Sequence, residues 1–375
     1  MNKKQLILGI VLLCVLFALG VYAQHRYPFN WHALRVQFIQ ARWRNFALGT
    51  ACIYAAYVFR TFRWTYLLRH NKRVPPFSLL GTQVMGFTAV ALIGRVADPV
   101  RPYLVAKKTG LPLSNQLAVY IVERLFDAGT MALIFSVALI SLTQEAIPHA
   151  EAVRQGHWGP FTTFMSIHPV IALNITRFGV LFATFLGGLF LLAIRMAGEV
   201  VASFFERVLG ALSTKLGRAV GDKIRAFHAG LDTMRSFADF GVTVGLSLAM
   251  WILITVAYLE TIRGFVANEQ LASMNPARCV VLMMASGGAS IFQLPVLGWF
   301  TQTLAVAAVF SAGFGVNKEA ATGCAAMLLL VTFISVIPVG LIWAQFEHVS
   351  LRKVTHESEV AEETLEADES LKAAE

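Results

Sequence analysis

Long apolar runs constrain this chain more than any other feature of its sequence. A helix needs about 20 apolar residues to cross the roughly 30 Å of hydrocarbon in a bilayer. The candidates are 6–23, 46–62, 77–93, 115–142, 173–194, 240–259, 278–294, 296–314 and 318–345. Hydrophobic residues make up 57% of the chain and charged residues 14%, against about 45–50% and about 25% in soluble domains. We therefore exclude a soluble protein and predict an all-α polytopic membrane protein.

The distribution of basic residues predicts the topology, because lysine and arginine in short loops mark the cytoplasmic side of a membrane. Lys3 and Lys4 place the N-terminus in the cytoplasm. The basic segments 60–73 and 195–238 are predicted to face the cytoplasm as well, whereas 143–172 is predicted to be an external loop. The prediction puts both termini in the cytoplasm.

Two pairs of apolar segments do not fit this topology if each segment crosses the membrane fully. The segment 95–112 carries four basic residues and is predicted to face the cytoplasm, yet an apolar segment lies on each side of it. The simplest solution makes 77–112 a re-entrant hairpin, so that only 115–142 crosses. By the same reasoning, 278–314 is a second re-entrant hairpin that enters from the external side. Irregular backbone at that depth is tolerated where protein or water surrounds it.

The chain then divides into two similar halves, with about six full spans plus two re-entrant helical hairpins in total. The predicted parts are a first transmembrane repeat at 1–142, the external loop at 143–172, a second transmembrane repeat at 173–346 with a cytoplasmic amphipathic segment at 199–237, and an acidic, disordered cytoplasmic tail at 347–375. Each half crosses three times, so the halves have opposite orientation. This inverted repeat is a hypothesis, because Gly and Pro residues that interrupt apolar runs would produce a similar pattern without any repeat. Inverted repeats with interrupted segments are typical of alternating-access transporters.

The segment 94–127 places a set of charged residues among apolar neighbours: Arg95, Asp98, Arg101, Glu123, Arg124 and Asp127. A charge at the bilayer centre costs about 2.5–3.5 kcal/mol on insertion scales, so each needs a partner or a function. Glu123 and Asp127 are four residues apart and share one helix face. We expect Arg95 and Arg101 to be their partners, since Arg124 is turned by about 100° from Glu123 on an ideal helix.

Two interpretations of this cluster remain open at the level of sequence. In the first, it is an ion-pair network that fixes the hairpin to the following helix. In the second, Arg95 and Arg101 bind the phosphate of a lipid headgroup, while Glu123 and Asp127 hold them in place. Arginine suits this role because its planar fork of N–H donors matches a phosphate.

Two further segments also have two interpretations each. Arg60, Arg63 and Trp64 are either interfacial anchors on the cytoplasmic side or the entrance at which a phosphate is captured. The segment 199–237 has apolar residues at three- and four-residue steps. It either lies on anionic lipid or packs over the transporter core.

Three motifs resemble one known family. They are FRTFRW at 59–64, the arginine-bearing segment from Gly94 to Arg101, and VERLFD at 122–127. They are similar to the transmembrane domain of lysylphosphatidylglycerol synthase and of the flippase-like membrane proteins that share it. The resemblance covers roughly 45–345. It implies a polytopic membrane domain concerned with lipids or glycolipids.

The sequence departs from that family's pattern in two places. Ala97 and Asp98 replace a glycine–glutamate pair in the first hairpin, and Gln302 stands where the second hairpin usually has an acid. We therefore do not expect a transport cycle that depends on both acidic residues. The synthase also has a soluble aminoacyltransferase domain, for which this chain has no room after its last span, so we do not expect lysyl transfer.

We expect a lipid transporter of the inner membrane rather than an enzyme. Its substrate would be an anionic lipid or a lipid-linked precursor. The alternative is an accessory protein that supports a lipid- or glycolipid-synthesising enzyme, which would then be its partner, without transport. The sequence has no phosphate-binding glycine loop, nucleophile motif or metal-ligand spacing, so we predict no catalytic residues, metal or cofactor, and no nucleic-acid partner.

Overall fold

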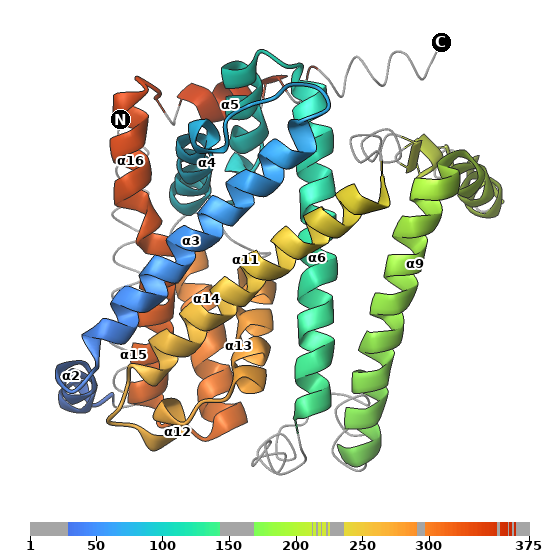
Figure 1. Cartoon of the computed structure of the whole chain (residues 1–375). Coiled ribbons are helices and arrows are strands. Elements are labelled where there is room, and N and C mark those ends of the chain that lie inside the picture. The colour runs from blue at the N-terminus through green and yellow to red at the C-terminus, as the bar shows by residue number, and fades with distance from the viewer. Residues whose placement is uncertain are drawn as a thin grey trace, which may run out of the picture.

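The computed structural model describes residues 29–142, 169–211, 236–290 and 297–350, and shorter stretches at 213–214, 217–218, 220–222, 224–225, 353–358, 360–361 and 364. These residues form helices and contain no strand (Figure 1). The prediction of an all-α membrane protein is therefore confirmed. The first candidate span, 6–23, and most of the predicted loop 143–172 lie outside the described residues.

The first half contains two long helices on either side of a helical hairpin. Its elements are α2 (Trp31–Ile39), α3 (Trp43–Leu68), the short helix η1 (Pro76–Leu79), α4 (Leu80–Ile93), η2 (Arg95–Ala97), α5 (Val100–Thr109) and α6 (Leu113–Ser141). Gly94 breaks the chain between α4 and α5 with φ 95° and ψ −167°, a conformation that is essentially restricted to glycine. Gly110 ends α5 in the left-handed conformation, as a C-terminal glycine commonly does.

The second half repeats this order. Its elements are α9 (Pro169–Gly210), α11 (Phe237–Arg263), α12 (Glu269–Ala272), α13 (Pro276–Ala289), α14 (Leu297–Ala308), the π-helical turn η5 (Val309–Gly313), α15 (Lys318–Leu329), the π-helical turn η6 (Leu330–Ile334) and α16 (Val336–Phe346). Side chains cap several of the N-termini: Ser236 and Asp239 form a capping box at α11, and Asn275 caps α13. Such caps satisfy the free N–H groups of a helix N-terminus.

Four helical segments of the described chain are long and apolar enough to cross a membrane. They are Pro76–Ile93, Leu113–Ser141, Ala238–Arg263 and Lys318–Phe346. The first of them is the segment that the sequence assigned to a re-entrant hairpin, so length and composition alone do not separate the two interpretations. The total of about six spans stays a prediction.

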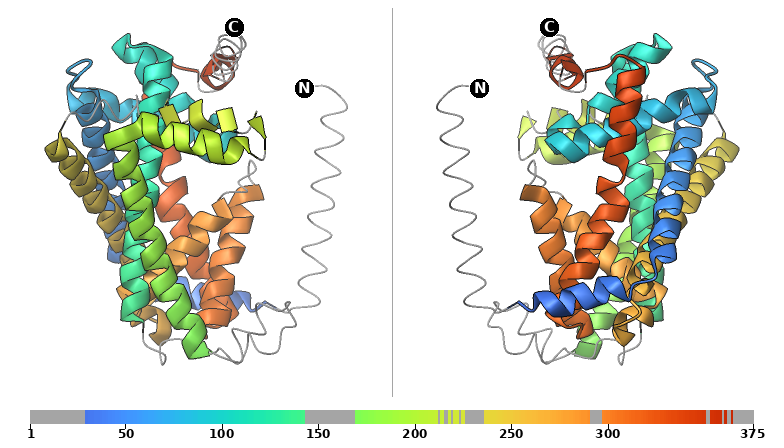
Figure 2. Two further views of the ribbon diagram at one scale, coloured as in Figure 1. Left: turned by 90° about the vertical axis from the view of Figure 1, so that its right-hand side faces the viewer. Right: turned by 90° about the vertical axis from the view of Figure 1, so that its left-hand side faces the viewer.

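The two hairpins lie at opposite ends of the molecule. In Figure 1, α4 and α5 occupy the upper end, and α13 and α14 the lower end. Figure 2 shows the same separation from both sides. Among the described residues, Arg95 at the tip of the first hairpin contacts Ser290 at the end of α13.

The packing pairs corresponding helices of the two halves. The long helices α3 and α11 pack along each other, α4 packs on α16, and α13 packs on α6. Small residues allow these close approaches, as in many membrane proteins. A Cβ on Gly49 would lie 2.7 Å from Thr261 Oγ1, and a Cβ on Gly340 would lie 1.9 Å from Thr88 Oγ1. The inverted repeat stays a hypothesis.

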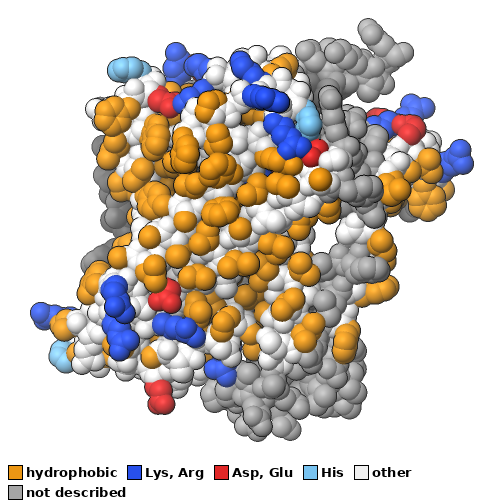
Figure 3. All heavy atoms as spheres, in the orientation of Figure 1, with side chains coloured by type: hydrophobic (Ala, Val, Ile, Leu, Met, Phe, Trp, Pro, Cys, Tyr) orange, Lys and Arg blue, Asp and Glu red, His pale blue; other side chains and the backbone are white. Residues whose placement is uncertain are grey.

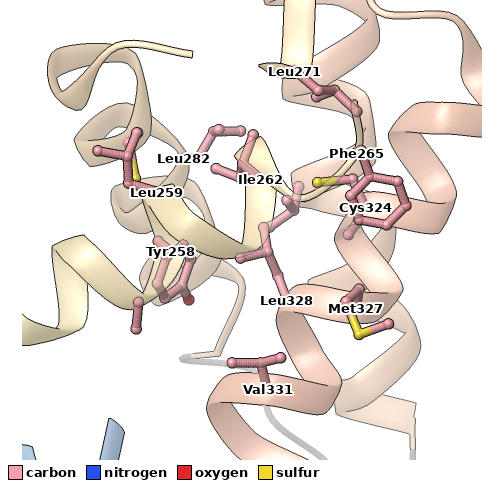
Figure 4. Packing of buried hydrophobic residues seen from close by; sticks show 14 of the residues in the cluster. Tyr258, Leu259, Ile262, Phe265, Leu271, Leu282, Cys324, Met327, Leu328 and Val331 are labelled. Atoms are coloured by element: carbon pink, nitrogen blue, oxygen red, sulfur yellow. The ribbon is translucent and has the colours of Figure 1, made fainter. Parts of the chain in front are cut away.

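The largest apolar core lies between the ends of α3, α11 and α15. Figure 4 shows Tyr258, Ile262 and Phe265 of the second half packed with Leu328 and Val331, all buried. The cysteines Cys279 and Cys324 are buried in the same core. They are free thiols that fill space, as the apolar setting of free cysteines in the sequence predicts.

The outer surface carries an apolar belt. In Figure 3, hydrophobic side chains cover the middle of the visible face, and lysine and arginine gather toward its two ends. Leu133 and Val137 of α6 belong to the exposed apolar side chains. A contiguous apolar surface of this extent marks contact with lipid.

Two predicted segments differ in the structure. The kink at Ala197 divides α9, so the candidate span at 173–194 and the start of the amphipathic segment 199–237 form one bent helix. Arg225 bonds both Glu199 and Glu206, so the segment folds back on itself after Gly210. The glycines in this segment lower the conformational free energy that such a turn costs.

The tail at 347–375 is also more ordered than predicted. Residues 353–358 are helical, and Val354 is buried beside Leu104 of α5. The acidic side chains of the tail explain the docking, because Glu347 accepts from Lys108 Nζ at 2.6 Å and Glu357 accepts from Tyr103 Oη at 3.0 Å. The prediction of disorder is corrected for these residues.

Candidate functional site

Glu123 and Asp127 lie on the buried face of α6, one helical turn apart. Both are buried, with only 1% and 6% of their surface exposed. Arg63 of α3 joins them: its Nη2 donates to Glu123 Oε1 and its Nη1 to Asp127 Oδ1, both at 2.7 Å. The same Nη1 donates to Ser247 Oγ of α11 at 2.7 Å. One guanidinium fork therefore connects α3, α6 and α11.

Arg101 of α5 is the second buried cation of the cluster. Its Nη1 lies 3.4 Å from Glu123 Oε1 and 3.4 Å from Gln83 Oε1. The guanidinium also faces the rings of Phe87 at 4.5 Å and Tyr120 at 5.0 Å, a cation–π arrangement. Arg101 thus fixes the first hairpin to α6, as expected from the sequence.

The position of Arg101 depends on a glycine in the neighbouring helix of the hairpin. A Cβ on Gly86 would lie only 2.1 Å from Arg101 Cγ. The aliphatic part of Arg101 therefore lies directly on the backbone of α4. No larger residue fits at position 86 without moving Arg101.

Arg60 and Arg124 complete the cluster at longer distances. Arg60 Nη1 lies 3.5 Å from Glu123 Oε1 and 3.9 Å from Asp127 Oδ2. Arg124 Nη2 lies 3.8 Å from Glu123 and 3.6 Å from Asp127. The expectation that Arg124 turns away is wrong, because its long side chain folds back toward both carboxylates.

Arg95 and Asp98 lie at the tip of the first hairpin, away from that cluster. Arg95 Nη1 is 3.8 Å from Asp98 Oδ2. Arg95 also donates from Nε to the carbonyl oxygen of Ser290 at 3.0 Å, and from Nη2 to Ser290 Oγ at 2.8 Å. The expected pairing of Arg95 with Glu123 and Asp127 is therefore replaced by a contact with the second hairpin.

The surface location expected for Arg60, Arg63 and Trp64 is corrected. Arg63 and Trp64 are each 1% exposed, and Arg60 is 8% exposed. Trp64 Nε1 donates to Gln116 Oε1 at 3.1 Å, and the ring packs in an apolar core with Leu67 and Leu68. The motif at 59–64 therefore points inward onto α6, because the acidic face of α6 neutralises its arginines.

A cavity of about 240 Å³ lies where the two halves meet. Arg60, Arg95, Asp98 and Arg124 line one side of it. Residues of the second half line the other side, and those among them that carry polar groups are Trp251, Tyr258, Ser286, Ser290, Gln302 and Thr332. The cavity thus receives side chains from both hairpins and from α3, α6 and α11.

The second-half side of the cavity has its own hydrogen-bond network. Gln302 Nε2 donates to Ser286 Oγ at 2.6 Å, and Tyr258 Oη lies 3.1 Å from the same Oγ. Sequence reasoning missed these residues, because uncharged polar side chains in apolar segments carry little signal. The one available sign was that Gln302 stands where the resembling family has an acid.

The described residues contain no group of three or more His, Cys, Asp or Glu side chains that could hold a metal ion. What the site offers chemically is hydrogen-bond donors and positive charge. Counting the cluster and the cavity together, arginines contribute five positive charges (Arg60, Arg63, Arg95, Arg101, Arg124) and carboxylates three negative ones (Asp98, Glu123, Asp127). The excess of two positive charges favours an anionic ligand.

The comparison with family models agrees with this architecture. Residues 6–340 match the model described as the lysylphosphatidylglycerol synthase TM region, so the match includes both hairpins and every residue of the charged cluster. A comparison with curated proteins gives no match. The match extends over nearly all of the membrane body, and the chain therefore belongs to the family of the lysylphosphatidylglycerol synthase TM region.

Proposed function

We propose that the protein moves a phosphate-headed anionic lipid, or a lipid-linked precursor with such a phosphate, between the leaflets of the inner membrane. The family is a membrane domain found in lipid-related proteins. The proposal goes further, to the movement of lipid and to the chemistry of the headgroup. It rests on the cavity between the two hairpins.

The observation that carries the proposal is a set of buried donors that lie near Glu123 and Asp127 but form no hydrogen bond with them. Arg60 Nη1 and two nitrogens of Arg124, Nε and Nη2, are buried and make no hydrogen bond with the described residues. Both side chains line the cavity. Leaving such a donor unsatisfied costs about 1–3 kcal/mol, and more for a charged group. A phosphate oxygen in the cavity would satisfy these donors.

The carboxylates have a supporting role in this proposal. Arg63 already donates one short hydrogen bond to each of Glu123 and Asp127. Arg60 and Arg124 approach the same carboxylates only at 3.5–3.9 Å. They are therefore held in place but keep N–H groups for a ligand. In this proposal the phosphate-binding role, which the sequence assigned to Arg95 and Arg101, belongs to Arg60 and Arg124.

The tips of the hairpins offer a way to alternate access. Arg95 and Ser290 connect them, and both residues line the cavity. A phosphate that draws Arg95 away from Ser290 would separate the hairpins on one side of the headgroup. The π-helical turn η6 contributes Thr332 to the same cavity, and such turns are frequent at functional sites.

We place the end that carries Arg69, Lys72 and Lys108 in the cytoplasm, on the basis of the charge rule. These residues lie together: Arg69 pairs with Asp239, Lys72 donates to Thr109 O at 2.6 Å, and Lys108 pairs with Glu347. The tail segment 353–358 would then be cytoplasmic too. A lipid-synthesising enzyme at this face is the partner that such a transporter would serve.

The test uses purified protein in vesicles that contain fluorescent phosphatidylglycerol. A membrane-impermeant reductant destroys the fluorescence of the outer leaflet only, so continued loss reports movement between leaflets. Arg124→Gln should slow the movement by more than about tenfold, since a charged hydrogen bond contributes about 1.5–3 kcal/mol. The protein should still accumulate, because Arg63 keeps both carboxylates paired.

The matched control is Arg44→Gln, which changes an exposed arginine near the start of α3. It should move lipid at the wild-type rate. Wild-type vesicles that move no lipid would contradict the proposal and favour the accessory role beside a lipid- or glycolipid-synthesising enzyme. Equal rates for Arg124→Gln and wild type would remove the cavity from the path.

A further inference from the structure

The two sides of the cavity differ in charge. Every charged group that lines it belongs to the first half: Arg60, Arg95, Asp98 and Arg124. The described lining residues of the second half are uncharged. A phosphate bound by Arg60 and Arg124 would therefore leave its headgroup substituent to uncharged groups of the second half such as Gln302 and Ser286.

The lining residues of the second half carry hydroxyl and amide groups that are hydrogen-bonded to one another. Gln302, Ser286 and Tyr258 form one chain of hydrogen bonds, with 2.6 Å and 3.1 Å between successive partners. Trp251 also lines the cavity, and its indole N–H is buried without an acceptor among the described residues. These groups can exchange hydrogen bonds with hydroxyls of a ligand, each of which donates and accepts.

A cationic headgroup finds no free partner here. Asp98 is the one carboxylate among the described lining residues, and it lies 3.8 Å from Arg95 Nη1. An ammonium group would have to leave water beside Gln302 and Ser286, with three arginines lining the same cavity. Desolvating a charge without a partner costs several kcal/mol, so the cavity discriminates against it.

Resting on the proposed function, we infer that the cavity selects a lipid whose phosphate carries an uncharged, hydroxyl-bearing substituent, and that Gln302 sets this selectivity. Gln302 is 9% exposed and lines the same cavity as Arg60, Arg95 and Arg124. Replacing its amide with a carboxylate changes no heavy-atom count and adds one charge. The Ser286 hydroxyl, which lies 2.6 Å from the Gln302 amide and can itself accept from Tyr258, can donate a hydrogen bond to that carboxylate, so Gln302→Glu is a variant that the cavity can accommodate.

The test measures binding and does not depend on transport. Purified protein in detergent is titrated with phosphatidylglycerol and with phosphatidylethanolamine of the same acyl chains, and bound lipid is counted by native mass spectrometry. Wild type should prefer the glycerol headgroup by more than about tenfold, the equivalent of 1.4 kcal/mol. Gln302→Glu should reduce this ratio by about tenfold or invert it, because the new carboxylate pairs with the ammonium.

Two further variants make the result specific. Gln302→Leu removes the amide without adding charge and should not raise ethanolamine binding. Gln345→Glu makes the same chemical change at an exposed position of α16 and should leave the ratio unchanged. A glycosylated lipid phosphate in a separate titration should bind as glycerol does, since its substituent is also neutral and hydroxyl-bearing.

The outcomes separate this inference from the proposed function. Equal binding of the two lipids by wild type would overturn the headgroup assignment, whatever the folding of the variants, and so would a ratio that Gln302→Glu does not change. Lipid movement in the vesicle assay could persist in either case. Absence of lipid movement together with the expected preference would instead overturn the proposed transport and leave the selectivity of the cavity in place.

Discussion

Single residues decide whether the charges of this membrane protein are tolerated. Arg63 satisfies two carboxylates from two different positions of α6 and also donates to α11. It is 1% exposed, so no water compensates for its loss. Arg124, with a third of its side chain exposed, touches the same carboxylates and remains available to a ligand. Neighbouring arginines therefore have different roles because of their burial.

We predict that Arg63→Met prevents stable folding. The change leaves Glu123 and Asp127 buried without their short bonds, and breaking a buried pair costs about 3–5 kcal/mol. Thermal unfolding of the detergent-purified protein and its yield measure the loss. The triple change Arg63→Met, Glu123→Gln, Asp127→Asn removes the charges together and should recover much of the yield. Failure to recover any would show that the fork itself, rather than charge balance, holds the helices.

Gly86 is a second position at which a single added atom would change the packing of the helices. We predict that Gly86→Ala lowers the thermal stability and displaces Arg101, because the added Cβ would lie 2.1 Å from Arg101 Cγ. Gly129→Ala is the matched control, since nothing lies within 4 Å of its Cβ. In a helix that control should stabilise by about 0.5–1 kcal/mol. A Gly86→Ala protein as stable as wild type would show that the hairpin shifts freely.

At the scale of elements, the tips of the two hairpins are joined differently from the long helices. Each hairpin consists of short helices, and the described chain joins their tips through Arg95 and Ser290. The long helices α3 and α11 pack along each other by contrast, with small residues at the contact. Interfaces that consist of few polar bonds open at lower free energy than packed cores.

We predict that Arg95→Gln loosens both hairpin tips at once. The shorter side chain loses its bonds to Ser290 and its ion pair with Asp98. Hydrogen exchange should become faster around 94–99 and at the C-terminal end of α13, and remain unchanged in α11. Faster exchange in α11 as well would indicate general destabilisation rather than opening at the tips.

At the scale of the whole molecule, the charges divide the protein into two ends. Lys108 lies at the end that carries the C-termini of α5 and α16, and Arg44 lies at the start of α3, toward the other end (Figure 1). The apolar belt of Figure 3 lies between them. The position of the membrane is inferred from this belt, because a large contiguous apolar surface on a membrane protein is typical of contact with lipid.

We predict that cysteines placed at 108 and 44, in a chain without its four native cysteines, react with impermeant maleimide from opposite sides. Lys108→Cys should react from the cytoplasmic side and Arg44→Cys from the external side. Labelling of both from one side would contradict the two-ended topology. Labelling of Lys108→Cys from the external side alone would invert the orientation.

The sequence by itself determined that the protein lies in a membrane, that it is helical, and which family it belongs to. Apolar runs of sufficient length have only helices as solutions in lipid, and the VERLFD motif placed Glu123 and Asp127 on one face of α6. The charged residues were also the candidates for a site, because a charge in apolar surroundings costs free energy unless it has a partner or a function.

Only the tertiary structure decided which charges meet. The sequence assigned Arg63 to the surface and Arg124 to another face, and packing reversed both, since long arginine side chains reach several ångströms from their helix. It also brought Gln302, Ser286 and Tyr258 to the cavity from positions more than 100 residues away from the arginines. Neutral polar groups leave little trace in a hydropathy pattern, and their partners are defined by distance in space rather than along the chain.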